Sequence, residues 1–214
     1  MATPAETPRQ EFAPRNDFLR ISGGVRVNYV TSSGYDTFSS NDALGQFSLE
    51  GSYAFLSSSR FSLAAGGAWD VGGRASGLRG TSSSLTLHRL SAPLEGRVHI
   101  SRAFYGFVRV APGAAAILTS VGQQGGQRDL EGTAWVFAAD ASVGTSILLG
   151  PRKETEKRSP RVWLTPEFGY SFATEADIKG VTRRDDPLGS DERTNFGTLA
   201  LNGVFWRVSA AITY

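Results

Sequence analysis

The two histidines, His88 and His99, are the side chains of this sequence best suited to moving a proton near neutral pH. A histidine acts as a general base only within hydrogen-bond reach of its nucleophile. Ser91 is the candidate nucleophile for His88, but nothing in the sequence places the two together. The chain has no cysteine, which excludes disulfides, thiolate metal sites and a cysteine nucleophile. We therefore predict no catalytic residue and no metal site.

The glycine-rich composition gives no support for a bound nucleotide. The chain contains 25 glycines, but no GxxxxGK[ST] run and no strand–glycine–helix unit accompanies them. The formal net charge is only +2, and basic residues are interspersed with acidic ones rather than forming a stripe. Such a balance gives little electrostatic attraction to nucleic acid. We expect no cofactor and no nucleic-acid partner.

A second group of residues that could take part in chemistry is charged and recurs at alternate positions among apolar residues. Alternation with a period of two is typical of strands with one apolar and one polar face. The charged parity contains five acids and six arginines, so an interior that holds them could be nearly neutral. We predict an interior charge network of Arg20, Arg26, Glu50, Asp70, Arg89, Glu95, Arg97, Arg109, Asp140, Glu167 and Arg207.

The elements that must position these charges are eight strands. Leu19, Ile21, Val25 and Val27 share one parity in the first strand, whereas Arg26 lies on the other. Pro93, Pro112 and Pro166 fall inside predicted strands, and we attribute them to bulges. The same alternation predicts strands near 18–29, 46–55, 61–71, 89–100, 104–118, 135–147, 162–172 and 204–214.

The connections between these strands alternate in length. Segments near 31–43, 72–84, 119–133 and 174–198 are long and polar, 56–60 and 101–103 are short, and 150–160 is a charged exception. Short turns at one end and long loops at the other are typical of bacterial outer-membrane barrels. Aromatic residues would form two lipid-interface girdles. Tyr53, Phe55, Phe61, Phe104, Trp163 and Tyr214 belong to the turn end, and Tyr29, Trp69, Trp135 and Phe172 to the loop end.

The chain ends in FWRVSAAITY, an alternating strand with a terminal aromatic residue, Tyr214. This ending resembles the C-terminal signature of bacterial outer-membrane proteins. Together with eight strands, it makes the chain similar to the small OmpA/OmpX-type barrels. The resemblance implies an all-β, eight-stranded antiparallel up-and-down transmembrane β-barrel. It also implies recognition of the last strand by the barrel-assembly machinery and insertion among outer-membrane lipids.

These expectations define one barrel at residues 17–214 behind a flexible Pro-rich leader at 1–16. We expect a mature form without its signal peptide, located in the bacterial outer membrane. Buried charges should pair across neighbouring strands, as in Glu95/Arg109, Arg109/Asp140 and Glu167/Arg207. The loops, including the segment Arg183–Asp186, could bind a protein partner. The predicted role is non-enzymatic: structural, or recognition at the cell surface, alone or within a larger envelope assembly.

Three alternatives remain open. A lipid-modifying enzyme would use His88, whose predicted lipid-facing position resembles a lipid A deacylase site, although the HRLS spacing lacks the His-x-Ser pattern of that family. A narrow pore would require the interior charge pairs to rearrange. A soluble lipocalin-like carrier would turn the apolar parity inward, which the period alone permits.

Overall fold

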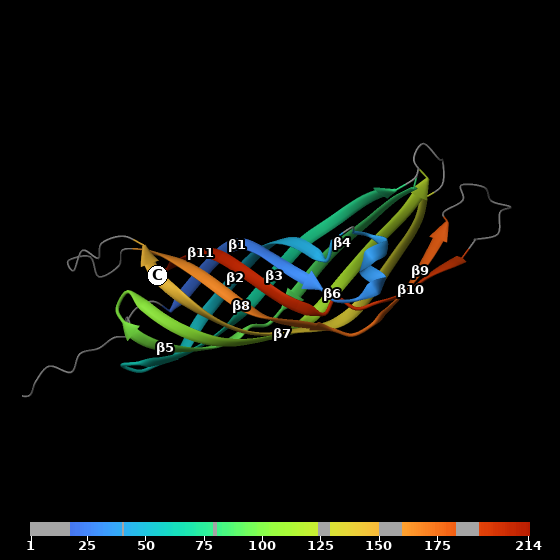
Figure 1. The fold of residues 1–214 in the computed structure, drawn as a ribbon. Coiled ribbons are helices and arrows are strands. Elements are labelled where there is room, and N and C mark those ends of the chain that lie inside the picture. The colour runs from blue at the N-terminus through green and yellow to red at the C-terminus, as the bar shows by residue number, and fades with distance from the viewer. Residues whose placement is uncertain (1–17, 40, 79–80, 124–128, 150–159, 183–192) are drawn as a thin grey trace, which may run out of the picture.

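The computed structural model describes residues 18–39, 41–78, 81–123, 129–149, 160–182 and 193–214, which form an elongated barrel (Figure 1). No helix among them is long and apolar enough to span a membrane. The elements are β1 (Leu19–Val30), the 3-10 helix η1 (Ser33–Thr37), β2 (Ala43–Ser57), β3 (Phe61–Leu78), β4 (Thr81–Ser91), β5 (Leu94–Ser101), β6 (Phe104–Gln123), β7 (Asp129–Leu149), β8 (Arg161–Ala173), β9 (Ala176–Thr182), β10 (Arg193–Leu199) and β11 (Gly203–Thr213).

The sheet closes into a ring because the first and last strands pair. β1 runs antiparallel to β2 on one side and to β11 on the other, with Arg20 opposite Thr213 and Val30 opposite Gly203. β4 and β5 occupy one position of the ring, since both lie between β3 and β6. Eight strand positions therefore close the barrel, and the predicted eight-stranded antiparallel fold is confirmed.

Pro93 and Pro166 interrupt strand pairing without shifting its register. Pro93 lies in the gap between β4 and β5, where the Ala92 N–H donates to the Pro112 carbonyl at 2.8 Å. Pairing with β6 resumes in the same register beyond that gap. Pro166 lies where the β7–β8 ladder is interrupted between Gly144 and Ile147. The predicted bulges at these prolines are wrong, because the register does not shift at any of them, and Pro112 lies opposite Ala139 in an uninterrupted β6–β7 ladder.

The two faces of the wall differ in polarity as the alternation predicts. Along β11, exposed Val204, Trp206 and Val208 alternate with buried Phe205 and Arg207. The apolar parity faces outward all round the ring, while arginines, carboxylates and hydroxyls face the lumen. This orientation overturns the soluble carrier alternative, which requires the apolar parity to line the interior.

Several strands run well beyond the predicted ends. β3 and β4 cover most of the segment 72–84, and β6 and β7 cover most of 119–133, so these predictions of long loops are wrong. The extended parts carry serine, threonine and glycine outside, as at Ser84, Thr86 and Ser120, which removes the hydrophobic alternation that marks a strand. β9 and β10 form a further hairpin at the same end, joined to β7 (Figure 1).

The lumen at this loop end is filled by apolar side chains. η1 turns inward, so that Tyr35 and Phe38 are buried against Leu44, Leu85 and Leu199. Gly34 permits this packing, because a Cβ there would lie 2.5 Å from the Thr198 carbonyl oxygen. Tyr35 donates its hydroxyl proton to the Ala43 carbonyl, and burial raises the pKa of that hydroxyl. We call this group, which also includes Ile117, Val136 and Ile178, the apolar plug.

Candidate functional site

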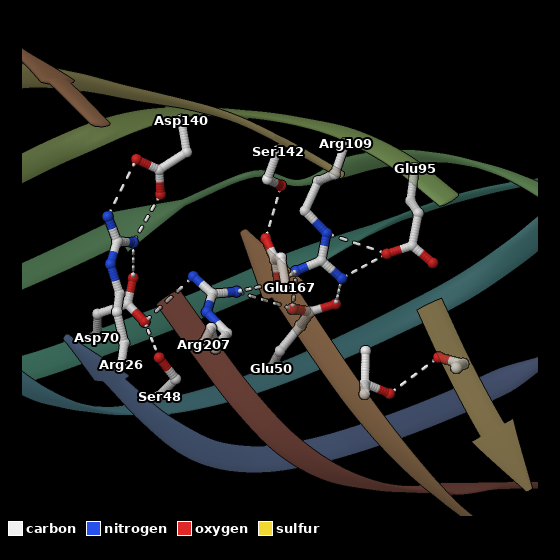
Figure 2. Close-up of polar contacts among 12 residues, drawn as sticks. Arg26, Ser48, Glu50, Asp70, Glu95, Arg109, Asp140, Ser142, Glu167 and Arg207 are labelled. Atoms are coloured by element: carbon white, nitrogen blue, oxygen red, sulfur yellow. Dashed lines mark hydrogen bonds and ion pairs between the residues drawn. The ribbon is translucent and has the colours of Figure 1, made fainter. Parts of the chain in front are cut away.

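The charged part of the lumen lies on the turn-end side of the apolar plug. The eleven side chains assigned to the interior network are between 1% and 7% exposed, and they come from all eight ring positions. Figure 2 shows how most of them converge inside the wall. They are Arg20, Arg26, Glu50, Asp70, Arg89, Glu95, Arg97, Arg109, Asp140, Glu167 and Arg207.

Arg109 joins three carboxylates at the centre of this lumen. Its Nη1 and Nη2 donate to the two carboxylate oxygens of Glu50 at 2.9 and 3.1 Å. Its Nε donates to Glu95 Oε2 at 3.0 Å, and its Nη1 lies 3.3 Å from Glu167 Oε2. Ser142 donates to the other oxygen of Glu167 at 2.6 Å. One guanidinium from β6 thus ties together β2, β5 and β8.

A second cluster lies toward the apolar plug and is centred on Asp140. Arg26 donates to its two carboxylate oxygens at 2.7 and 3.2 Å, and Arg89 donates to Oδ1 at 2.7 Å. Asp70 accepts a hydrogen bond from Ser48 and lies 3.4 Å from Arg26. Two arginines and two aspartates therefore neutralise one another in this layer.

Arg207 on β11 connects the two clusters. Its guanidinium nitrogens lie 3.5 Å from Glu167, 3.7 Å from Glu50 and 3.7 Å from Asp70 (Figure 2). These separations exceed those around Arg109, and Arg207 approaches carboxylates of both clusters. The interior charges thus form one connected network rather than separate pairs.

Two of the three ion pairs predicted from the sequence are present in the structure. Glu95 pairs with Arg109, and Glu167 lies 3.5 Å from Arg207. The predicted Arg109/Asp140 pair is wrong, because the β6–β7 register puts Arg109 opposite Ser142 and Asp140 opposite Ala111. Asp140 therefore lies nearer the plug.

The turn end of the lumen holds polar and aromatic side chains. Arg97 donates from Nε to Glu95 Oε1 at 2.6 Å, and buried His99 lies 2.9 Å from Ser62 Oγ through its Nε2. Tyr105 packs its ring on His99, at 5.2 Å between centroids. Tyr105 is not among the predicted lumen residues, although it shares the parity of Arg109 on the same strand, which places both side chains inside the barrel.

Trp163 contradicts its predicted place in the turn-end girdle. It is 2% exposed and faces the lumen, where its Nε1 donates to Thr213 Oγ1 at 3.0 Å. Its neighbours Val162 and Leu164 both face outward, so the period of two requires Trp163 to point inward. Nearness to a strand end therefore does not decide which face of the sheet Trp163 lies on, whereas its parity does.

The other nine aromatic residues assigned to the girdles include Phe61, which is 39% exposed, and Phe104, which is half-buried; the remaining seven lie on the outer face. Their exposure ranges from 37% for Trp69 to 69% for Trp135. Trp69 lies near the middle of β3 because that strand extends beyond it, yet further along the outer face carries Gly73 and Ala75 on β3 and Ser84 and Thr86 on β4. The seven are Tyr29, Tyr53, Phe55, Trp69, Trp135, Phe172 and Tyr214.

His88 lies beside this outer aromatic group. Its ring stacks on Trp69, with centroids 6.1 Å apart and planes 7° apart. Ser91, three positions along the same strand, has the opposite parity and faces the lumen side. The two side chains lie on opposite faces of the wall and cannot form a His–Ser dyad.

Among the described residues, no group of three or more His, Asp or Glu side chains could hold a metal ion. The carboxylates that converge in the lumen form ion pairs with arginines instead. These ion pairs can stabilise the barrel and fill its interior.

No protein-family model and no curated protein matches the chain. Among solved structures it is similar to Ail, the attachment invasion locus protein of Yersinia pestis, with a TM-score of 0.51 and 12% identity over 93% of this chain and 99% of Ail. OprG from Pseudomonas aeruginosa gives a TM-score of 0.47 at 10% identity, covering 93% of this chain and 96% of OprG. The protease OmpT from Escherichia coli gives 0.47 at 8%, covering 95% and 97%. The likeness to Ail shows the shared fold of a small outer-membrane barrel.

Replacing Arg109 tests whether the carboxylate cluster stabilises the fold. The Arg109→Met variant would leave Glu50, Glu95 and Glu167 with too little positive charge, and we expect it to lose about 3–5 kcal/mol of unfolding free energy. Urea titration of the protein folded in lipid vesicles measures the loss. Arg207→Met is the matched control, because its longer contacts predict a smaller loss. Equal losses in the two variants would contradict the central place of Arg109.

Proposed function

We propose that this protein is integral to the bacterial outer membrane and that its closed barrel has a structural or surface-recognition role. The observation that carries the proposal is the inversion of polarity across the wall. Large apolar side chains are exposed on every strand of the ring, whereas the charged side chains are buried within it.

The outer face supports placement in a bilayer. Val25, Leu90, Val108, Phe137 and Trp206 are each more than half exposed. A continuous apolar surface of this kind is unfavourable in water and matches the hydrocarbon of a membrane. The ring also gives its strands hydrogen-bond partners on both sides, which a sheet immersed in lipid requires.

The filled lumen favours a closed barrel over a constitutive channel. The network around Arg109 and Arg207 crosses the lumen, and the apolar plug covers it at the loop end. An eight-stranded barrel leaves an interior just wide enough for side chains. Ion passage would require several of these contacts to break together.

The extended hairpins β3–β4, β6–β7 and β9–β10 support recognition at the loop end. The hairpins β3–β4 and β6–β7 continue the wall beyond Trp69 and Trp135 (Figure 1), and Ser84, Thr86, Ser120 and Thr133 lie on its outer face there. Such a rigid platform can present loops to a protein partner. The segment Arg183–Asp186, assigned to this role from the sequence, lies outside the described residues, as does the leader at 1–16.

The last strand supports assembly through the barrel-assembly machinery. β11 carries exposed Val204, Trp206, Val208 and Ile212 in strict alternation and is followed by Tyr214, which is 59% exposed. We propose a non-catalytic role, since the His88 ring lies on Trp69 and its expected partner Ser91 faces the opposite side of the wall.

Membrane integration is tested by fractionating bacterial cells that produce the protein fused to a cleavable export signal. We expect it in the outer-membrane fraction, resistant to carbonate extraction. The unheated protein should also migrate faster than the boiled protein on a detergent gel, because the closed barrel stays folded in detergent. Recovery as a water-soluble monomer without detergent would be incompatible with the proposal.

Closure of the lumen is tested by conductance in planar bilayers. We expect the folded protein to give no stable channel steps, because ion pairs and the apolar plug occupy the interior. The double variant Glu167→Gln, Arg207→Ala removes charges from one side of the network and should raise conductance above that of the unaltered protein. Steady open channels from the unaltered protein, with heat-modifiable mobility confirming its fold, would support a pore instead.

A further inference from the structure

A small cavity lies in the lumen at the turn end, on the far side of the glutamate cluster from the apolar plug. Its volume is about 20 Å³. Arg97, His99, Ser62, Tyr105, Trp163 and Thr213 line its inner part, and exposed Phe18 and Ser57 lie at its rim. We call this space the turn-end cavity. It has room for one water-sized particle.

The charges around the turn-end cavity do not cancel. Among the residues that the structure describes, the lumen holds six buried arginines and five buried carboxylates, and the excess cation is Arg20. Arg20 is 2% exposed, and within the described part of the chain its guanidinium bonds only to hydroxyls. These belong to Tyr105, Thr165 at 2.7 Å and Ser146 at 3.4 Å, while its Nε has no hydrogen-bond partner.

A buried guanidinium without a counter-charge is costly. Glu95, the carboxylate with which Arg20 interacts electrostatically, already pairs directly with Arg97 and Arg109. The other lumen carboxylates, of Glu50, Glu167, Asp70 and Asp140, pair with further arginines. Within the described residues Arg20 therefore forms no direct ion pair, and its charge is only partly offset by Glu95.

The lining of the turn-end cavity is suited to an anion. Tyr105 receives a hydrogen bond from Arg20 and keeps its own hydroxyl proton to donate. Thr213 accepts from Trp163 Nε1 at 3.0 Å and likewise retains a hydroxyl proton. When His99 carries its proton on Nε2, it donates to Ser62 Oγ and frees that hydroxyl as well. Up to three hydroxyl donors and the Arg97 guanidinium then border one small space.

We propose that the turn-end cavity binds a small monovalent inorganic anion, chloride, as the counter-ion of Arg20. The Tyr105 hydroxyl links the two, since it accepts from Arg20 and borders the cavity. The cavity volume favours a single halide over a tetrahedral phosphate or sulfate. The exposed rim at Phe18 and Ser57 gives the ion access from the turn end.

Chloride binding is measured by the broadening of the chloride-35 NMR line with the folded protein in detergent. Gluconate replaces chloride at constant ionic strength, and protein-free micelles supply the blank. We expect saturable broadening that Arg20→Met weakens by about tenfold or more, because the charge that attracts the ion is gone. Arg60→Gln, which removes an exposed charge near the same end, should bind as the unaltered protein does.

Two further measurements keep the outcome decisive if Arg20→Met fails to fold. Thr213→Val removes one hydroxyl donor but keeps Arg20, and we expect a several-fold loss of chloride affinity. Crystals grown in bromide should show an anomalous peak between Tyr105 and Arg97. Broadening no greater than that of the micelles, unchanged binding in the variants, or an empty cavity in bromide would each overturn the proposal.

Discussion

A charge sealed inside a closed sheet cannot reach bulk water, so it needs a counter-charge within the lumen. Arg109 on β6 meets this requirement by reaching Glu50 on β2, Glu95 on β5 and Glu167 on β8. The contacts with Glu50 and Glu167 cross the lumen, because β6 pairs with neither β2 nor β8, whereas Glu95 lies directly opposite Arg109 on the neighbouring strand. The charges therefore connect opposite sides of the ring in addition to the backbone ladder.

The side chains inside the barrel form layers along its axis. The apolar plug, with η1 folded inward, covers the charged layers at the loop end, whereas hydroxyls and aromatic rings occupy the turn end. Outside, apolar side chains cover the level of the charged layers and give way to serine and threonine on the extended strands. In the proposed function, the apolar wall contacts lipid and the longer hairpins form the surface available to partners.

The period of two was sufficient to predict eight strands and the inward parity of the charges, because both depend only on alternation along each strand. The partner of each charge depends on register between strands, which is why the Arg109/Asp140 pair was wrong. Trp163 was misplaced by its nearness to a strand end, although its own parity pointed inward. The strand extensions beyond Val71 and Leu118 were missed because their outer face carries little hydropathy contrast.

Quenching of single tryptophans by brominated lipid tests the inverted wall most directly. Two variants, each keeping only Trp206 or only Trp163 and carrying phenylalanine at the other three tryptophans, are folded into vesicles of lipid brominated along the acyl chain. Trp206 is 57% exposed on the outer face, and Trp163 is 2% exposed in the lumen. We expect strong quenching of Trp206 and little of Trp163. Equal quenching of the two, or an unquenched Trp206, would contradict a lipid-facing apolar wall around a charged lumen.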